Sequence, residues 1–520
     1  MAAPERISRA GFSCASGHAK LVAATASGPE KVSPEKRLTA LEHAVRPRVL
    51  ARYGGQLAIT VAILNVLPLG AALFAGAFVS AAAFACVVAL LGCCGWLGLR
   101  VEAPEEIQAN EALVLAAAAF VLTPLALAWP LSTYGLTPVD AWFEAVSAVT
   151  TTGLSTIAAP QQQPWALLLT RSWMQWYGGL GFALLCVVML VPRGLAARRL
   201  LEPSGARELN IPSMTIHARQ LFVAYMAMSV IGWLALWLAE RDGLAALMHV
   251  LSGVSTGGFS SLNASLAGFR HPASAWVLSL ITLAAAVSLP LYLSVARGDW
   301  RRFAMDPEFR ALLIMTLVFA AMLTAILAAS GINLPAALKH GFLLGVSAQT
   351  TSGFSSLDPS VLPDAAKWTS ILSMTVGGSV GSTAGGIKLL RLLVLLRVVQ
   401  LFVRRMGLPP HAVAEARING RVLEAGEILQ ILAVPTLFIA AIAVSVIPFL
   451  VHGYVPIDAL FEVVSATGTV GLSTGITGSD LPGVLKTVLA FDMLAGRLEF
   501  IALLVVLSPH TWFGKRYESE

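Results

Sequence analysis

The chain has 520 residues, of which 57% are hydrophobic and only 12% are charged, and its mean hydropathy is +0.76. A soluble globular protein carries about a quarter charged residues, so too little polar surface remains here to cover a water-soluble globule. The composition excludes an ordinary soluble protein and predicts an all-α polytopic membrane protein, with membrane lipid as its solvent.

The basic residues behind the net charge of +6 follow a membrane topology and do not indicate a nucleic-acid partner. Most of the 35 Lys and Arg lie in alternate loops of the predicted topology: the tail to Arg52, Arg100, and the stretches 193–219, 297–310, 388–421 and 515–516. Because Lys and Arg are in excess in cytoplasmic loops, this alternation predicts that both termini are cytoplasmic.

The chain begins with a polar tail and two apolar spans. Residues 1–52 are basic and rich in Ala, Ser and Pro, and they lack the apolar core of a signal peptide, so they predict a cytoplasmic N-terminal tail. Residues 53–101 form a two-helix N-terminal membrane segment, because 56–99 carries no charge and is long enough for two spans of roughly 20 residues. The five cysteines show neither metal-ligand spacing nor a disulfide context.

The rest of the chain is one unit used four times. The pattern S-x-x-x-T-x-G-[LF]-S recurs with its glycine at Gly153, Gly258, Gly353 and Gly471. An apolar span precedes each copy and another follows it, so each repeat is a span, a pore segment and a span. The predicted units are pore repeat 1 at 107–200, repeat 2 at 212–300, repeat 3 at 306–407, repeat 4 at 422–514 and a cytoplasmic C-terminus at 515–520.

A short helix precedes each motif. The segment 138–149 and its three counterparts have about a dozen residues, which as a helix cover about 18 Å, roughly half of the bilayer core. Pro138 and Pro456 suit a first helical turn, and the acids that follow them favour the positive end of the helix dipole. Each half-length helix is therefore expected to start outside and to end at mid-membrane, where the Thr-x-Gly segment begins.

The repeated motif has the chemistry of a cation filter. Irregular backbone at membrane depth requires protein or a water-filled path to satisfy it, and rings of carbonyl oxygens can replace the water shell of a cation. Glycine is needed where crowded backbones adopt φ/ψ values closed to other residues. One Thr-x-Gly motif is more often a tight turn, but four copies in register behind half-length helices favour a filter.

At these residues the chain resembles a known family. Thr469-Val-Gly471 is similar to the centre of the potassium-channel filter TVGYG, and the fourfold plan resembles the Trk/Ktr/HKT potassium transporters, above all the bacterial TrkH/TrkG potassium-uptake subunits. Two further matches are Gly377-Gly-Ser-Val-Gly-Ser-Thr-Ala-Gly-Gly386-Ile-Lys388 and Met493-Leu-Ala-Gly-Arg497-Leu-Glu499. The resemblance covers about 53–514.

The resemblance implies a potassium filter at the four motifs. Its residues are expected to be Thr151, Thr152, Gly153, Thr256, Gly257, Gly258, Thr351, Ser352, Gly353, Thr469, Val470 and Gly471. In plant relatives a serine in place of the first-repeat glycine accompanies sodium transport, so Gly153 favours potassium as the transported ion. Because the residue before the glycine varies among the repeats, lower selectivity than in a tetrameric potassium channel is expected.

The Gly-rich match is expected to form a flexible intramembrane gate below the filter. Its composition breaks a helix, and its residues are Gly377, Gly378, Gly381, Ser382, Thr383, Gly385, Gly386 and Lys388. The alternative is a packing interface of small residues. The resemblance implies that Arg497 is an electrostatic barrier and a latch for the gate, and the alternative is an ion pair with Glu499 or Asp492. Arg171 is expected to be an interfacial anchor at the outer end of its span.

The resemblance also implies partners. The chain contains no nucleotide-binding loop, so we expect no bound organic cofactor, with NAD or ATP on a separate TrkA-like cytoplasmic regulatory subunit of a Trk system. A homodimer in the bacterial inner membrane is expected. Passive transport and proton symport are both compatible with the motifs.

Three alternatives follow from the residues. A membrane-embedded enzyme would show His, Asp or Glu clustered inside the spans, whereas the nine histidines are scattered. A potassium-binding subunit of a P-type ATPase complex would share the architecture but would need a pump partner. A secondary transporter with inverted repeats would have pore segments that begin on opposite sides, whereas all four are expected to begin outside.

Overall fold

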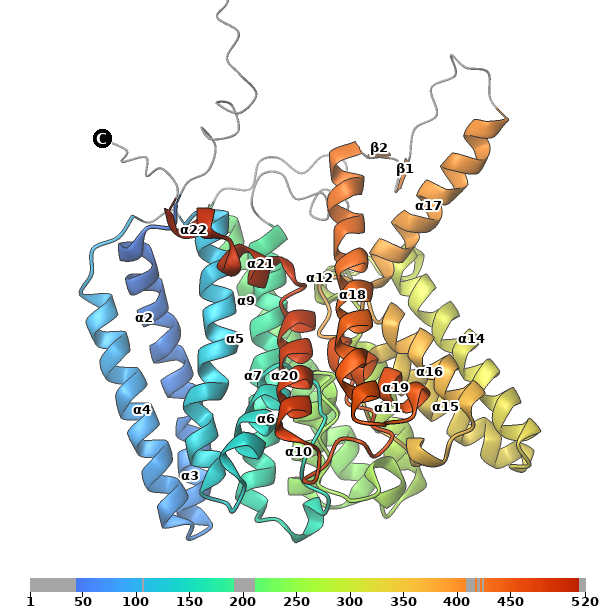
Figure 1. Cartoon of the computed structure of the whole chain (residues 1–520), viewed down its shortest axis with the longest axis horizontal. Coiled ribbons are helices and arrows are strands. Elements are labelled where there is room, and N and C mark those ends of the chain that lie inside the picture. Colours follow the sequence, from blue (N-terminus) through green and yellow to red (C-terminus); the bar gives the residue numbers. More distant parts are fainter. Residues whose placement is uncertain are drawn as a thin grey trace, which may run out of the picture.

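The fold is described from a computed structural model that covers residues 44–104, 107–190, 211–407, 417–418, 421–422 and 425–513. Most of the predicted N-terminal tail and the predicted C-terminus at 515–520 lie outside these residues. The described chain is a bundle of helices (Figure 1), and its two short strands, β1 (Arg417–Ile418) and β2 (Arg421–Val422), pair antiparallel at one end of the bundle. The prediction of an all-α membrane protein is confirmed.

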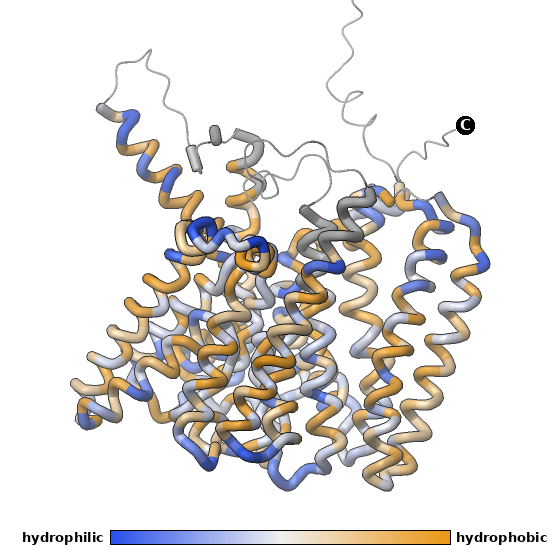
Figure 2. The backbone as a smooth tube through the Cα atoms, turned by 180° about the vertical axis from the view of Figure 1, so that it is seen from behind, coloured by the Kyte–Doolittle hydropathy of each residue, from blue (hydrophilic) through white to orange (hydrophobic). Residues whose placement is uncertain are grey.

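Six helical segments of the described chain are long and apolar enough to cross a membrane. They are α2 (Pro47–Leu64) with α3 (Val66–Phe74), α4 (Phe78–Leu99), α5 (Ala109–Ser132), α9 (Ile211–Glu240), α14 (Pro307–Ala329) and α18 (Ala425–Val451). Apolar residues run along the length of the bundle, whereas hydrophilic residues gather at its two ends (Figure 2). This pattern is typical of helices solvated by lipid.

The N-terminal helices α2 and α4 pack closely through glycines. A Cβ built on Gly55 would lie 2.9 Å from the Cα of Gly98, and a Cβ on Gly95 would lie 2.8 Å from the carbonyl oxygen of Gly55. Because no side chain separates the two backbones, the helices approach each other in the way that small residues allow in membranes. This pair covers one side of the bundle beside α5 (Figure 1).

Each repeat contains a shorter helix between its two spans. These helices are α6 (Pro138–Val149), α10 (Gly243–Val254), α15 (Leu334–Thr350) and α19 (Pro456–Thr467). Side chains of Thr137, Asp242 and Asn333 cap the first three at their N-termini. The helix α15 has 17 residues and is longer than the dozen expected, because Asn333 caps it further from the motif than the caps of the other repeats.

The helices that follow the four motifs differ in continuity. In repeat 1, α7 (Trp165–Leu190) is unbroken. In repeat 2, α11 (Pro272–Ala285) and α12 (Leu289–Ala296) meet at a bend of 94°. The Gly-rich segment separates α16 (Asp364–Val376) from α17 (Leu389–Met406) in repeat 3. In repeat 4, α20 (Gly483–Arg497) ends before two residues with positive φ, Glu499 and Phe500, and α21 (Ile501–Leu507) follows.

Two of these interruptions, in repeats 2 and 4, differ from the expectation that one unbroken apolar span follows each motif. At the first break the only helix-breaking residue is Pro290, in the first turn of α12, and at the second break Leu498 to Phe500 contain neither glycine nor proline. The remaining elements are short: α13 (Trp300–Met305), α22 (Pro509–Phe513), and the 3₁₀ turns η1 (Pro160–Gln162), η2 (Ser265–Gly268) and η3 (Pro359–Val361).

Candidate functional site

The four Thr-x-Gly segments share one backbone conformation. The motif threonines have left-handed φ values of 55° at Thr151, 52° at Thr256, 54° at Thr351 and 49° at Thr469. The motif glycines also have positive φ: 93° at Gly153, 77° at Gly258, 72° at Gly353 and 94° at Gly471. A threonine in this conformation is strained, and such strain gathers at functional sites. The recurrence in all four repeats shows that the conformation belongs to the motif.

The first serine of the motif holds this turn. In each repeat the residue before the glycine donates its backbone N–H to the serine carbonyl, as Thr152 does to Ser147 at 2.9 Å and Val470 to Ser465 at 2.8 Å. In repeats 1 and 4 the serine hydroxyl also accepts the N–H of the motif glycine at 3.0 Å. The serine of the repeated pattern therefore fixes the exit of the chain from each short helix.

The four glycines lie in a closed ring. A Cβ built on Gly153 would overlap the carbonyl oxygen of Gly257 and lie 3.3 Å from the Cα of Gly258. A Cβ built on each of the other glycines also lies close to the Cα of the next glycine. The distances are 3.1 Å from Gly258 to Gly353, 3.2 Å from Gly353 to Gly471 and 3.0 Å from Gly471 to Gly153. In every case the Cβ would also overlap the carbonyl oxygen of the residue that precedes the neighbouring glycine. Only glycine allows four backbones to meet this closely.

Buried polar groups support the ring from behind in repeat 1. The carboxylate of Glu144 accepts hydrogen bonds from Ser155 Oγ at 2.8 Å and from the backbone N–H of Thr156 at 2.6 Å. Its other oxygen lies 2.8 Å from Arg171 Nη2, and the Arg171 guanidinium lies 3.9 Å above the ring of Phe259 in repeat 2. The expectation that Arg171 is an interfacial anchor is wrong: it is 2% exposed and pairs with Glu144 inside the protein.

Repeat 4 uses the same group at this place, whereas repeat 2 uses a different one. In repeat 4, Glu462 accepts from Ser473 Oγ at 2.6 Å and from Thr474 N–H at 2.7 Å, which repeats the Glu144 arrangement. In repeat 2, the imidazole Nε2 of His249 lies 2.9 Å from Ser260 Oγ. The backbone conformation is the same in all four repeats, but the side chains that support it differ between repeats.

A glutamine from α7 contacts the ring directly. Gln175 donates from Nε2 to the Gly257 carbonyl at 2.5 Å and accepts the N–H of Phe259 at 3.2 Å. Because a carbonyl oxygen has two lone pairs, the Gly257 oxygen keeps one for another partner. Gln175 thus fixes the orientation of a backbone carbonyl that belongs to the candidate filter.

The Gly-rich segment lies against the inner ends of the short helices. Gly385 donates its N–H to Thr351 Oγ1 at 2.6 Å, and Gly386 donates to the Gly468 carbonyl at 3.1 Å. Thr383 Oγ1 donates to the Val254 carbonyl, the last residue of α10, at 3.0 Å. The segment therefore contacts the motif ends of repeats 2, 3 and 4.

Arg497 contacts this segment from α20. It is 1% exposed, and its Nη1 donates to the Thr383 carbonyl at 2.9 Å. Glu499, one of the two acids considered as its ion-pair partner, lies 2.5 Å from Arg391 instead. Asp492, the other, accepts a hydrogen bond from Ser445 Oγ at 2.7 Å. Lys388, at the end of the segment, donates from Nζ to the Ala384 carbonyl.

The oxygens gathered at the ring are neutral carbonyl and hydroxyl groups. Within the described residues, no group of three or more His, Cys, Asp or Glu side chains could hold a metal ion. Neutral oxygens at close quarters suit a partly dehydrated monovalent cation rather than a tightly bound divalent metal.

Comparisons with known proteins show the family and the fold of the chain. The family model TrkH, described as a cation transport protein, matches residues 97–512. The chain belongs to the TrkH family. It is 28% identical over 393 residues to the Trk system potassium uptake protein TrkH of Escherichia coli strain K12, covering 72% of this chain and 80% of that protein. It is 29% identical to the same-named protein of Halomonas elongata, covering 79% of this chain and 88% of the relative.

A solved structure shares the fold. The crystal structure of the potassium transporter TrkH from Vibrio parahaemolyticus superposes with a TM-score of 0.79 at 25% sequence identity, over 90% of this chain and all of that one. The matched relatives are named as transport proteins and not as enzymes. This TrkH-family chain is therefore a multi-pass membrane protein of a cation transport family.

Sequence reasoning missed Gln175 and the partners of Arg171. No local pattern marks Gln175, because its role depends on the packing of α7 against repeat 2. A signal for Glu144 and Glu462 was present, since the flank Pro-x-Asp-Ala-x-Phe-Glu recurs before the motifs of repeats 1 and 4. The recurrence of a glutamate at one fixed distance before the glycine indicates a shared contact, which the structure places behind the motif.

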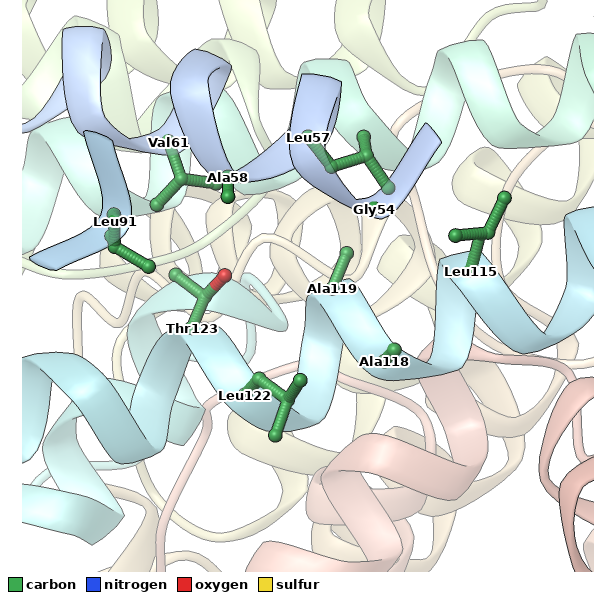
Figure 3. A pocket seen from close by; sticks show the side chains of 10 residues that line it. All are labelled: Gly54, Leu57, Ala58, Val61, Leu91, Leu115, Ala118, Ala119, Leu122 and Thr123. Carbon is green, nitrogen blue, oxygen red and sulfur yellow. The ribbon is translucent and has the colours of Figure 1, made fainter. Parts of the chain in front are cut away.

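A cavity of about 120 Å³ lies apart from the ring, between α2, α4 and α5 (Figure 3). Its lining is apolar apart from Thr123: Gly54, Leu57, Ala58, Val61, Leu91, Leu115, Ala118, Ala119 and Leu122. An apolar lining offers a cation no ligands. The cavity therefore does not belong to the ion pathway of this TrkH-family chain.

Proposed function

We propose that this chain is the potassium-conducting subunit of a Trk-type uptake system. The observation that carries the proposal is the closed ring of Gly153, Gly258, Gly353 and Gly471, in which four backbones meet and no side chain separates them. Rings of backbone carbonyls substitute for the hydration shell of potassium. The names of the relatives, potassium uptake proteins, support potassium as the ion.

The filter oxygens would come from the residues that precede each glycine. The carbonyls of Thr152, Gly257, Ser352 and Val470 each lie against the glycine of a neighbouring repeat, so they are at the ring. The left-handed threonines lie one residue earlier and turn the chain toward it. In each repeat the proposed potassium ligands are the threonine, the residue after it and the motif glycine.

The gate would be the segment 377–386 with its latch at Arg497. The contacts of Gly385 and Gly386 with Thr351 and Gly468 support a closed position at the inner side of the ring. The bond from Arg497 to the Thr383 carbonyl supports a latch, and a buried guanidinium below a cation filter would also raise the electrostatic barrier to passage. Opening would require these contacts to break.

Regulation would come from outside the chain. The helix α17 continues from the proposed gate and projects from the end of the bundle (Figure 1), and it carries Arg391, Arg397, Arg404 and Arg405. A basic helix joined to the gate is suited to contact a TrkA-like cytoplasmic subunit that senses NAD or ATP. The excess of Lys and Arg on this side supports cytoplasmic termini in the inner membrane. A homodimer is part of the proposal.

The test is growth rescue of a potassium-uptake-deficient bacterium, with and without a regulatory subunit, by Gly153→Ser and Gly471→Ser. A side chain at either position strikes a neighbouring carbonyl, so the preference for potassium over sodium should fall. Gly70→Ser is the matched control, because nothing lies within 4 Å of its Cβ position. Unchanged cation preference in both filter variants contradicts the filter. Potassium flux through the purified chain in liposomes separates it from the potassium-binding subunit of a P-type pump.

A further inference from the structure

The break between α11 and α12 is occupied by the Gly-rich segment. Breaking a helix leaves backbone groups without partners, and here these groups are buried. Ser379 donates its N–H to the Ala286 carbonyl at 3.0 Å, and Leu289 donates its N–H to the Gly381 carbonyl at 3.0 Å. The Thr383 hydroxyl shares its single hydrogen between the Ala285 carbonyl at 3.2 Å and the Val254 carbonyl at 3.0 Å. We name residues 285–289 the seat.

A buried carboxylate holds the same segment from a second element. Glu308 lies in the first turn of α14 and is 4% exposed, and its Oε2 accepts the backbone N–H of Val380 at 2.8 Å. Val380 lies between Ser379 and Gly381, two of the three residues that bond to the seat. A buried ionisable side chain in a membrane protein is expensive to keep, and this one bonds to the proposed gate and not to the ring.

The seat and Glu308 are joined by one short connector. The helix α13 links α12 to α14, and its ends are exposed, with Trp300 at 64% and Met305 at 65%. The ring of Phe303 on α13 lies 5.7 Å from Tyr292 on α12 and 4.7 Å from Phe309 on α14. The three aromatic rings connect the two sites that hold the segment, so a displacement of α13 acts on both.

We propose that Glu308 is a positioning residue of the gate, which together with the seat forms an inner clamp that holds the segment 377–386 closed independently of Arg497. The inference rests on the proposed gating role of that segment. The clamp holds the segment at Ser379, Val380, Gly381 and the Thr383 side chain, whereas Arg497 binds the Thr383 backbone carbonyl. The exposed connector α13 is the place at which a cytoplasmic partner would release the clamp.

The experiment uses a cysteine-free chain that carries Ser382→Cys in the segment, where the native side chain is fully buried. In proteoliposomes, the rate of labelling by a membrane-impermeant thiol reagent and the potassium flux are measured together. Glu308→Ala removes the acceptor of the Val380 N–H and leaves that buried donor without a partner, so both rates should rise about tenfold with the ratio of potassium to sodium flux unchanged. Glu308→Gln keeps an acceptor and should give a smaller rise. Glu102→Ala, an exposed acid outside the clamp, should change neither rate.

The outcomes separate the clamp from the gate. Labelling and flux that stay at the unsubstituted level in Glu308→Ala overturn the clamp, while a rise in Arg497→Ala would keep the proposed gate. If neither Glu308→Ala nor Arg497→Ala raises flux, and Gly153→Ser leaves cation preference unchanged, both the clamp and the proposed function are wrong. Phe303→Ala is a second test that spares the carboxylate, and it should also raise labelling because it uncouples α13 from both sites. A merely structural role for Glu308 predicts lower protein stability without faster labelling.

Discussion

The carboxylate of Glu144 lies 2.8 Å from the guanidinium of Arg171, and both side chains are buried directly behind the first-repeat turn. The same carboxylate holds Ser155 and Thr156, which follow the motif glycine. A buried ion pair is thereby connected to the position of a single backbone segment at the ring.

Arg171→Leu is expected to lower the free energy of unfolding by about 3–5 kcal/mol, because it leaves a buried carboxylate without its cation. The melting temperature of the purified protein in detergent measures this loss. Glu144→Gln combined with Arg171→Leu should recover part of it, since no charge is then left unpaired. Arg241→Leu, at an exposed position, is the matched control. A melting temperature equal to that of the control would show that the pair does not stabilise the repeat.

Gln175→Leu is expected to reduce the preference for potassium over sodium. The substitution removes the donor to the Gly257 carbonyl and the acceptor of the Phe259 N–H, so the second-repeat backbone loses both fixed contacts. Each lost bond costs about 1 kcal/mol, and a buried group left without a partner costs more. The ratio of potassium to sodium flux in proteoliposomes reports the effect.

Gln349→Leu is the matched control for Gln175. Gln349 Nε2 donates to the Gly377 carbonyl at 2.6 Å, at the start of the Gly-rich segment and not at the ring. Its loss should alter the amount of flux and leave the ion ratio unchanged. Equal ion ratios in the two variants would remove Gln175 from the filter support.

The sequence predicts the repeated parts of this molecule well and the unrepeated parts poorly. The four Thr-x-Gly segments are recognisable because one backbone conformation, with positive φ at threonine and glycine, demands the same residues each time. The partners of those segments differ: Glu144 with Arg171 in repeat 1, His249 in repeat 2. Contacts between distant helices leave no local pattern.

The breaks between α11 and α12 and between α20 and α21 are also difficult to predict from the sequence. The glycines of the Gly-rich segment predict its break, whereas the first of these two breaks has only Pro290 beside it, and Leu498 to Phe500 contain neither glycine nor proline. The first break is stabilised by hydrogen bonds from residues 379–383, nearly a repeat away in the chain. A helix that ends because another segment satisfies its backbone is only weakly marked by its own residues.

Gly95→Leu is expected to destabilise the N-terminal helix pair by about 1–3 kcal/mol through overpacking. A Cβ at this position lies 2.8 Å from the Gly55 carbonyl oxygen and also strikes the side chain of Ile59, so α2 and α4 must separate. Gly92→Leu in the same helix is the control, because nothing lies within 4 Å of its Cβ position. Thermal unfolding in detergent compares the two. Equal melting temperatures would show that the close approach of α2 and α4 does not contribute to stability.

Arg497→Ala is expected to raise potassium flux, because the Thr383 carbonyl loses the donor that holds the Gly-rich segment and a positive charge leaves the inner side of the ring. Arg497→Lys keeps the charge but cannot reproduce the geometry of a guanidinium donor, so it separates the two contributions. If the hydrogen bond dominates, flux in Arg497→Lys should approach that of Arg497→Ala; if the charge dominates, it should stay near the unsubstituted level. Arg404→Ala, exposed at the end of α17, controls for the loss of a basic residue. Unchanged flux in Arg497→Ala, measured in proteoliposomes without a regulatory subunit, would remove the latch from the mechanism.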